Sequence, residues 1–107
     1  MIRYQQCGQC AAVWYFERAF CPRCGSTDPR TLEASGLGVV YATTVVHRAP
    51  MPELRDQLPY LITLVDANEG FRVMGRGELD VVIGERVRAR PIELGGREFP
   101  FFAPCQR

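Results

Sequence analysis

The sequence contains no lysine, a single histidine and a single tryptophan, and it carries almost no net charge. All thirteen basic residues are arginines, and the twelve acidic residues leave a formal charge of +1. A near-neutral chain lacks the bulk positive potential that draws proteins to nucleic acid or to anionic membranes. Arginine can bind phosphate or carboxylate through paired hydrogen bonds, but we interpret the bias more simply as a reflection of genomic base composition.

Long apolar runs are also missing. No stretch approaches the about 20 apolar residues that span a membrane, and the N-terminus "MIRYQQCGQC" has no apolar signal core. We therefore expect a cytoplasmic protein, with no membrane contact, whose thiols stay reduced. The sequence also lacks a glycine-rich phosphate loop and the pattern of a long helix. Its 107 residues predict one domain or two very small ones.

The scarcity of histidine bears on catalysis. A cysteine nucleophile needs a neighbouring base and a group that orients the base. The odd cysteine is Cys105, and the only histidine, His47, lies at the end of a predicted strand. We interpret both residues as bystanders, and we predict a chain that has no catalytic residues and is not an enzyme.

The feature that stands out is a pair of Cys-x-x-Cys motifs, "CGQC" and "CPRCG". Each motif can supply half of a tetrahedral metal site, and four sulfur ligands leave no open position for water or substrate. Gly25 suits the positive φ of such a turn, whereas Ala11 occupies the equivalent place in the first motif. Redox-active pairs or disulfides are disfavoured by a reducing cytosol and by the lack of a βαβ pattern. We predict one structural Zn²⁺ per chain, preferred over iron, with ligands Cys7, Cys10, Cys21 and Cys24.

The rest of the chain has the texture of a β-protein. β-branched and aromatic runs, separated by glycine and proline, predict five strands, at residues 37–48, 60–66, 71–78, 85–94 and 97–104. A proline-rich segment, residues 49–59, reads as a loop. We predict a mainly β fold, with a rubredoxin-like zinc ribbon at residues 1–33 and a small five-stranded OB-fold barrel at residues 34–107. A β-sandwich is the alternative that periodicity leaves open.

Two stretches of the predicted barrel are candidate contact surfaces. Period-two alternation places Arg86, Arg88 and Arg90 on one sheet face, which either binds phosphates or an acidic partner or is simply solvated. The same alternation turns Phe102 away from its aromatic neighbours in "EFPFFAP", which would fill the barrel. We therefore predict Phe102 to be an anchor that faces a partner.

The order of these motifs resembles a family of bacterial and archaeal proteins. A four-cysteine ribbon is followed by "SGLGVVYATT", "PYLITLVDANEG", "IGERVRAR" and "FPFFAP". Together they resemble the zinc-ribbon plus OB-fold proteins associated with acyl-CoA enzymes, and the resemblance covers nearly the whole chain. The resemblance implies the same four cysteine ligands.

It also implies a function in lipid metabolism as a non-catalytic accessory or scaffold subunit. The expected partner is a thiolase-superfamily enzyme, such as a lipid-transfer-protein-like thiolase or aldolase, or alternatively a hot-dog-fold enoyl-CoA hydratase. The OB-fold part would bridge enzymes, assist substrate channelling or help bind acyl-CoA. Family members often carry a helical extension before the ribbon. With the first cysteine at residue 7, we expect that helix to be absent or reduced, which weakens direct acyl-CoA binding.

Two alternatives belong to other classes of protein. The first is a module that binds single-stranded nucleic acid, with Tyr41, Tyr60 and Phe71 as a stacking platform and residues 86–90 as a basic rail. A pI of about 7.6 disfavours it. The second is a rubredoxin-like electron carrier that holds iron in the four cysteines.

Overall fold

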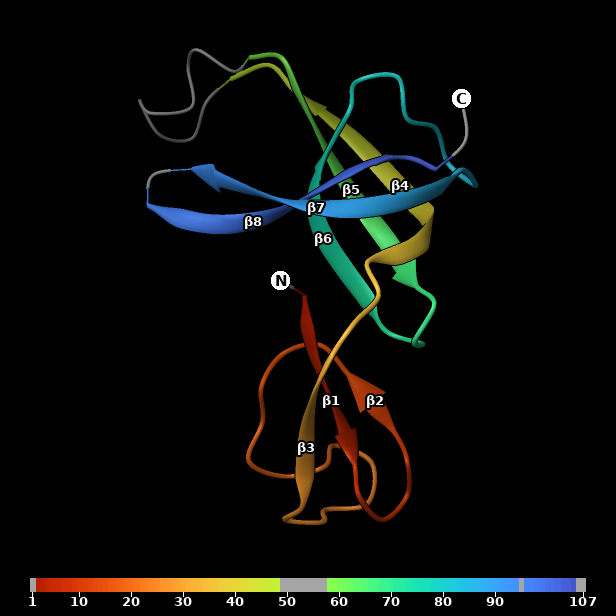
Figure 1. Ribbon diagram of the computed structural model, residues 1–107, viewed down its shortest axis with the longest axis vertical. Helices are drawn as coiled ribbons and strands as arrows, with labels where there is room; N and C mark the ends of the chain where they lie inside the picture. The colour runs from red at the N-terminus through yellow and green to blue at the C-terminus, as the bar shows by residue number, and fades with distance from the viewer. Residues whose placement is uncertain (1, 49–57, 95, 106–107) are drawn as a thin grey trace.

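The computed structural model describes residues 2–48, 58–94 and 96–105, and all of its regular structure is β (Figure 1). No helix occurs in that part of the chain, so none that could cross a membrane is found there. Most of the predicted loop at residues 49–59 lies outside the described residues. The strands are β1 Arg3–Cys7, β2 Val13–Trp14, β3 Pro29–Glu33, β4 Leu37–Val46, β5 Tyr60–Ala67, β6 Arg72–Gly77, β7 Arg86–Leu94 and β8 Arg97–Pro104.

The N-terminal part is a small antiparallel sheet with strand order β2-β1-β3. Its strands read "RYQQC", "VW" and "PRTLE", and they lack the clean apolar alternation that identifies a strand in sequence. A buried amide stabilises this sheet. The Oε1 atom of Gln5 accepts hydrogen bonds from Trp14 Nε1 at 2.6 Å and from the backbone N–H of Arg18 at 2.7 Å. Gln5 and the single tryptophan thus fix the chain around the centre of the ribbon.

The remaining strands close into a barrel in the order β4-β5-β6-β8-β7. Neighbouring strands are antiparallel except β6 and β8, which are parallel. β4 is the longest strand, and a bulge between Val40 and Ala42 bends it so that it pairs with both β5 and β7. This closed five-stranded barrel confirms the predicted OB-fold, and the alternative β-sandwich is wrong.

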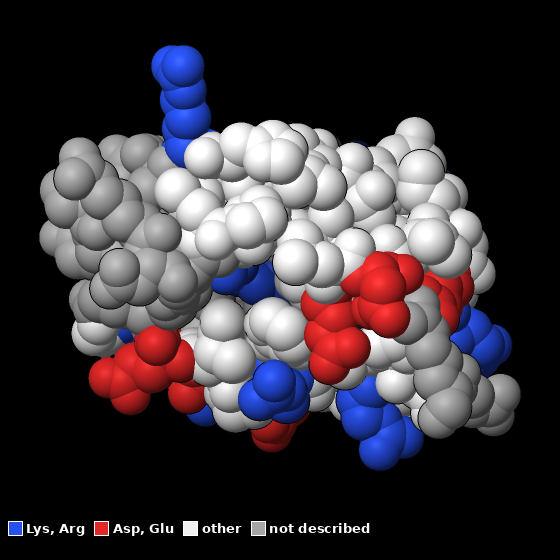
Figure 2. Space-filling view, turned by 90° about the horizontal axis from the view of Figure 1, so that it is seen from above, with Lys and Arg blue, Asp and Glu red and all other residues white. Residues whose placement is uncertain are grey.

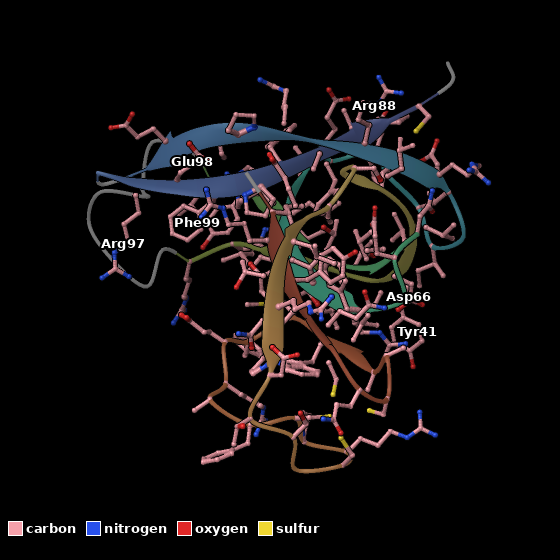
Figure 3. The ribbon with its side chains drawn as sticks, turned by 60° about the horizontal axis from the view of Figure 1, so that its bottom comes forward. Tyr41, Asp66, Arg88, Arg97, Glu98 and Phe99 are labelled. Atoms are coloured by element: carbon pink, nitrogen blue, oxygen red, sulfur yellow. The ribbon has the colours of Figure 1, made fainter. Side chains whose placement is uncertain are left out.

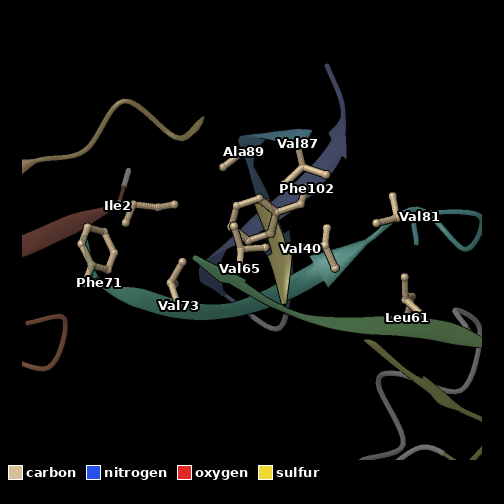
Figure 4. Packing of buried hydrophobic residues seen from close by; sticks show 10 residues of the cluster. All are labelled: Ile2, Val40, Leu61, Val65, Phe71, Val73, Val81, Val87, Ala89 and Phe102. Carbon is tan, nitrogen blue, oxygen red and sulfur yellow. The ribbon is translucent and has the colours of Figure 1, made fainter. Parts of the chain in front are cut away.

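The barrel core is made of aliphatic side chains around one phenylalanine (Figure 4). Phe102 is 1% exposed, so the prediction that it is a surface anchor is wrong. It lies directly opposite Ala89, whose small side chain also points inward. Gly75 makes further room, because a Cβ there would lie 2.8 Å from the Phe102 ring. The predicted alternation of the three phenylalanines holds, but its direction is reversed: Phe102 faces in and Phe99 faces out.

Packing continues from the barrel into the ribbon. Ile2 belongs to the barrel core although it precedes β1. Phe71, just before β6, is stacked on Tyr4 at 4.9 Å between ring centroids and on Tyr15 at 5.7 Å. These contacts hold the ribbon against one end of the barrel. The predicted domain boundary between residues 33 and 34 falls between β3 and β4, and it stays a prediction. Side chains from the two sides of this boundary pack against each other.

Candidate metal centre

The four cysteines of the two motifs come together at the end of the ribbon far from the barrel (Figure 1). Their sulfur atoms all lie within 4.8 Å of one another, and two pairs, Cys7–Cys24 and Cys10–Cys21, are 3.6 Å apart. A tetrahedral zinc with Zn–S bonds of about 2.3 Å places its sulfurs about 3.8 Å apart. The cluster therefore fits one tetrahedral metal ion.

Backbone N–H groups point at the sulfurs in each motif. In the first motif, the N–H groups of Gln9 and Cys10 donate to Cys7 Sγ at 3.3 and 3.4 Å. The second motif repeats this arrangement around Cys21, with both distances 3.4 Å. Such donors stabilise negative charge on sulfur, so the turns are arranged for thiolates rather than thiols.

Both turns close with a residue in the left-handed region. Gly25 has φ +77° and Ala11 has φ +62°. Their N–H groups donate to the carbonyls of Cys21 and Cys7, at 3.0 and 3.2 Å respectively. The expectation for Gly25 is confirmed, and the first turn adopts the same conformation despite the side chain of Ala11. An L-residue in this region costs about 1–2 kcal/mol, which the site tolerates at Ala11.

The electrostatics of the cluster call for a cation. The N–H groups of Cys10 and Gln9 lower the pKa of the Cys7 thiol to about 6. At Cys21, burial raises the pKa, but the N–H groups of Cys24 and Arg23 outweigh it and the net shift is downward. At Cys24, the N–H of Ser26 lowers the pKa, but the neighbouring sulfurs outweigh it and raise the value to about 12. A divalent ion at the centre lets all four sulfurs be thiolates together.

The chemistry of the donor set selects the metal and its role. Four thiolates suit zinc or iron, and they fill a tetrahedral shell completely. Cys7 and Cys21 are buried beside Trp14, while the other two sulfur ligands belong to exposed residues. The four cysteines are thus positioned to bind one metal ion in a closed, structural site. Gln5 and Trp14, which support this site, were missed in the sequence, because nothing in "YQQC" signals a buried amide.

The arginines named from the sequence lie elsewhere, on the barrel. Arg86, Arg88 and Arg90 are exposed on the outer side of β7, while Val87 and Ala89 between them are buried. The predicted alternation of this strand is therefore confirmed. The structure does not bring these arginines to the cysteines, which lie in the ribbon.

The predicted stacking platform for nucleic acid is not formed. Tyr60 and Phe71 are buried, and Phe71 is stacked between ribbon side chains. Tyr41 is 51% exposed, but the guanidinium of Arg72 lies 3.5 Å from its ring centroid. Arg72 is held there by Asp66, with Nε and Oδ1 2.7 Å apart, and Figure 3 shows Tyr41 and Asp66 side by side. That prediction is wrong, because Tyr60 is buried, Phe71 packs against the ribbon, and the ring of Tyr41 is covered by the guanidinium of Arg72.

Two family models match the chain in succession. The rubredoxin-like zinc ribbon domain of ChsH2 matches residues 2–30, and the C-terminal OB-fold domain of ChsH2 matches residues 32–90. The first of these descriptions agrees with zinc as the metal of the cysteine cluster.

Similar proteins include scaffolds and a hydratase subunit. A DUF35 domain-containing scaffold protein of Methanocaldococcus jannaschii is 36% identical over 89 residues, which cover 78% of this chain and 62% of that protein. A probable enoyl-CoA hydratase alpha subunit of Thermomonospora curvata is 39% identical over 70 residues, which cover 65% of this chain and 21% of that protein. The chain thus spans less than two thirds of the length of these curated relatives.

Two solved structures resemble the chain over nearly its full length. A chain of the Ltp2-ChsH2(DUF35) aldolase superposes with a TM-score of 0.82 at 32% identity, covering 95% of this chain and 83% of that one. A DUF35-family protein of unknown function from Sulfolobus solfataricus superposes with a TM-score of 0.61 at 14% identity, covering 96% and 75%. The second likeness concerns the fold alone.

Proposed function

Because the chain belongs to the ChsH2 family of zinc-ribbon and OB-fold proteins, we propose that it is a non-catalytic accessory subunit that docks onto an acyl-CoA enzyme. The observation that carries the proposal is the likeness, over 95% of the chain, to a chain of the Ltp2-ChsH2(DUF35) aldolase. The name of the archaeal relative, a scaffold protein, supports the same role. The partner that we propose first is a thiolase-superfamily enzyme of the lipid-transfer-protein-like kind.

The arrangement of reactive side chains supports a non-catalytic role. Among the described residues, the four cysteines are the one cluster of His, Cys, Asp and Glu side chains suited to hold a metal ion, and their sulfurs close the shell. No hydrogen bond within the described part of the chain joins Cys105 to His47. The zinc therefore supports folding, and the barrel supplies the surface for docking.

The surface of the barrel supports docking. Large hydrophobic side chains are exposed at residues Tyr41, Val45, Met74, Leu79, Val82, Ile83 and Phe99. Figure 2 looks down on the end of the molecule away from the ribbon and shows a broad expanse of uncharged atoms. A protein partner that docks on the barrel would bury such exposed side chains.

Co-expression with candidate enzymes tests the proposal. The chain is produced with a lipid-transfer-protein-like aldolase encoded in the same genome and, separately, with a hot-dog-fold hydratase, the partner class suggested by the Thermomonospora relative. Size-exclusion chromatography with light scattering then measures whether a complex elutes in fixed stoichiometry, and metal analysis measures its zinc. A fixed-ratio complex with the aldolase supports the proposal, and one with the hydratase alone changes the partner. A zinc-loaded chain that elutes alone in both cases refutes it.

A further inference from the structure

We infer that the outer side of the β7–β8 hairpin is a docking surface for a protein partner that presents carboxylates beside apolar side chains. The inference rests on the proposed accessory function and names the surface that performs it. We call this surface the arginine face. It consists of Arg86, Arg88 and Arg90 on β7 together with Phe101 and Ala103 on β8.

The three arginines form a row of positive charge. They occupy alternate positions of one strand, so neighbouring members are about 7 Å apart along it. All three are exposed, and in Figure 3 Arg88 projects outward from the hairpin, away from the barrel. A row of like charges repels itself unless opposite charge lies nearby.

No acidic side chain within the described residues forms an ion pair with this row. Two other arginines of the described residues are paired: Arg72 with Asp66 at 2.7 Å and Arg30 with Asp28 at 3.6 Å. In contrast, no ion pair joins any arginine of the row to a described acidic side chain. Acidic groups on a partner would supply the missing charge, and their approach would be steered by the row.

The second strand of the hairpin adds apolar surface to the charge. Arg88 lies opposite Ala103, and Arg90 lies opposite Phe101. The guanidinium of Arg90 sits 4.7 Å from the centroid of the Phe101 ring. Arginine and aromatic side chains are enriched in protein–protein interfaces and dominate their binding energy. The composition of the arginine face is therefore that of a contact surface.

A small hollow marks where a partner side chain fits. It has a volume of about 270 Å³ and is lined by Arg88, Ala89, Arg90, Ala103, Pro104 and Cys105. Small-molecule sites are commonly about 300–1,000 Å³, so this hollow is more suited to one side chain than to a nucleotide. A carboxylate entering it would meet two guanidinium groups, each able to donate paired hydrogen bonds.

The tip of the hairpin argues against a nucleic-acid ligand. Glu93 and Glu98 lie directly opposite each other there, and both are exposed. A phosphate backbone that followed the arginine row along the hairpin would run toward these carboxylates and be repelled. The hairpin twists strongly, so Phe99 and Arg97 near the tip point to the other side from Arg88 (Figure 3). The surface is thus confined to the part of the hairpin that lies over the barrel.

Charge reversal tests the inference on the complete zinc-loaded chain with the co-expressed acyl-CoA enzyme as probe. The double variant R88E/R90E is compared with R3E/R18E, which makes the same change of charge at two exposed arginines of the ribbon. Reversal on the arginine face should weaken binding about 100-fold, and reversal on the ribbon less than about threefold. Zinc content and melting temperature show that both variants remain folded, and a labelled twelve-nucleotide single strand is titrated against the same proteins.

Each outcome separates the inference from the proposed function. If the wild type binds the enzyme and R88E/R90E binds equally well, the arginine face is not the docking surface although the accessory function stands. Equal weakening by both variants would reveal a general charge effect and overturn the inference. Micromolar binding of the oligonucleotide that R88E/R90E abolishes would assign the face to nucleic acid. A wild type that binds no acyl-CoA enzyme overturns both proposals.

Discussion

Replacing Phe102 by alanine removes the aromatic side chain around which the barrel packs. The ring is 1% exposed, and it faces Gly75, which has no side chain to fill the space that the ring would leave. A buried Phe→Ala substitution costs about 3–5 kcal/mol, and sites that cannot collapse lie at the upper end. Small domains are stabilised by only about 5–15 kcal/mol. Since 1 kcal/mol corresponds to about 4 °C in a domain near this size, the melting temperature should fall by about 12–20 °C.

Phe99→Ala is the matched control, because it makes the same chemical change three residues away in β8. Phe99 is 39% exposed, so its removal should cost about 1 kcal/mol or less. Thermal unfolding followed by circular dichroism, and urea unfolding, are measured for both variants in excess zinc. A cost for Phe99→Ala equal to or larger than that for Phe102→Ala would refute the inward orientation of Phe102 and the register of β7 with β8.

Three further predictions concern the ribbon. Ala11→Gly should stabilise it by about 0.5–1 kcal/mol, because the relief of left-handed backbone strain exceeds the entropy cost of glycine. Gly25→Ala should destabilise it by about 1 kcal/mol for the opposite reason. Urea unfolding, followed by the fluorescence of the single tryptophan, measures both changes, and effects of the opposite signs would contradict the turn geometry. Cys21→Ser should abolish stoichiometric zinc and unfold the ribbon, since three ligands leave the shell open, and retained zinc in metal analysis would exclude Cys21 as a ligand. Backbone N–H groups lower the pKa of Cys7 from 9.0 to about 6, so the stability that its thiolate contributes is full above pH 9 and is lost as the pH falls toward 6. Because protons compete with zinc for the thiolates, the affinity for zinc should fall over the same range, and an affinity that does not change between pH 9 and pH 6, read with a chromogenic chelator, would contradict this.

Most of the barrel could be predicted because its strands carry strong local signals. The predicted last strand coincides with β8, and the predicted second and fourth strands differ from β5 and β7 by one residue at one end. The metal ligands could be predicted equally well, because two Cys-x-x-Cys motifs close together in the sequence specify a tetrahedral site without any knowledge of distant contacts. These features depend on nearest neighbours in the chain.

What could not be predicted depends on contacts between distant segments. The direction of Phe102 is fixed by the register of β8 against β7, and period-two alternation alone does not say which face is inside. The fate of Phe71 depends on two rings from the ribbon. The strands of the ribbon could not be predicted from the sequence, because metal ligation and one buried amide stabilise them and they need no apolar face.

The shortness of β1 links the metal to the barrel. The strand has five residues, follows directly after Ile2 in the barrel core, carries Tyr4 of the ring stack, and ends at the ligand Cys7. Demetallation at one end therefore loosens the anchor of the barrel at the other, and it uncovers Phe71 to solvent. The supply of zinc thus affects the stability of the barrel as well as that of the ribbon. A chain starved of zinc presents newly exposed aromatic surface, the feature that cellular quality control recognises, so its abundance should follow the availability of the metal.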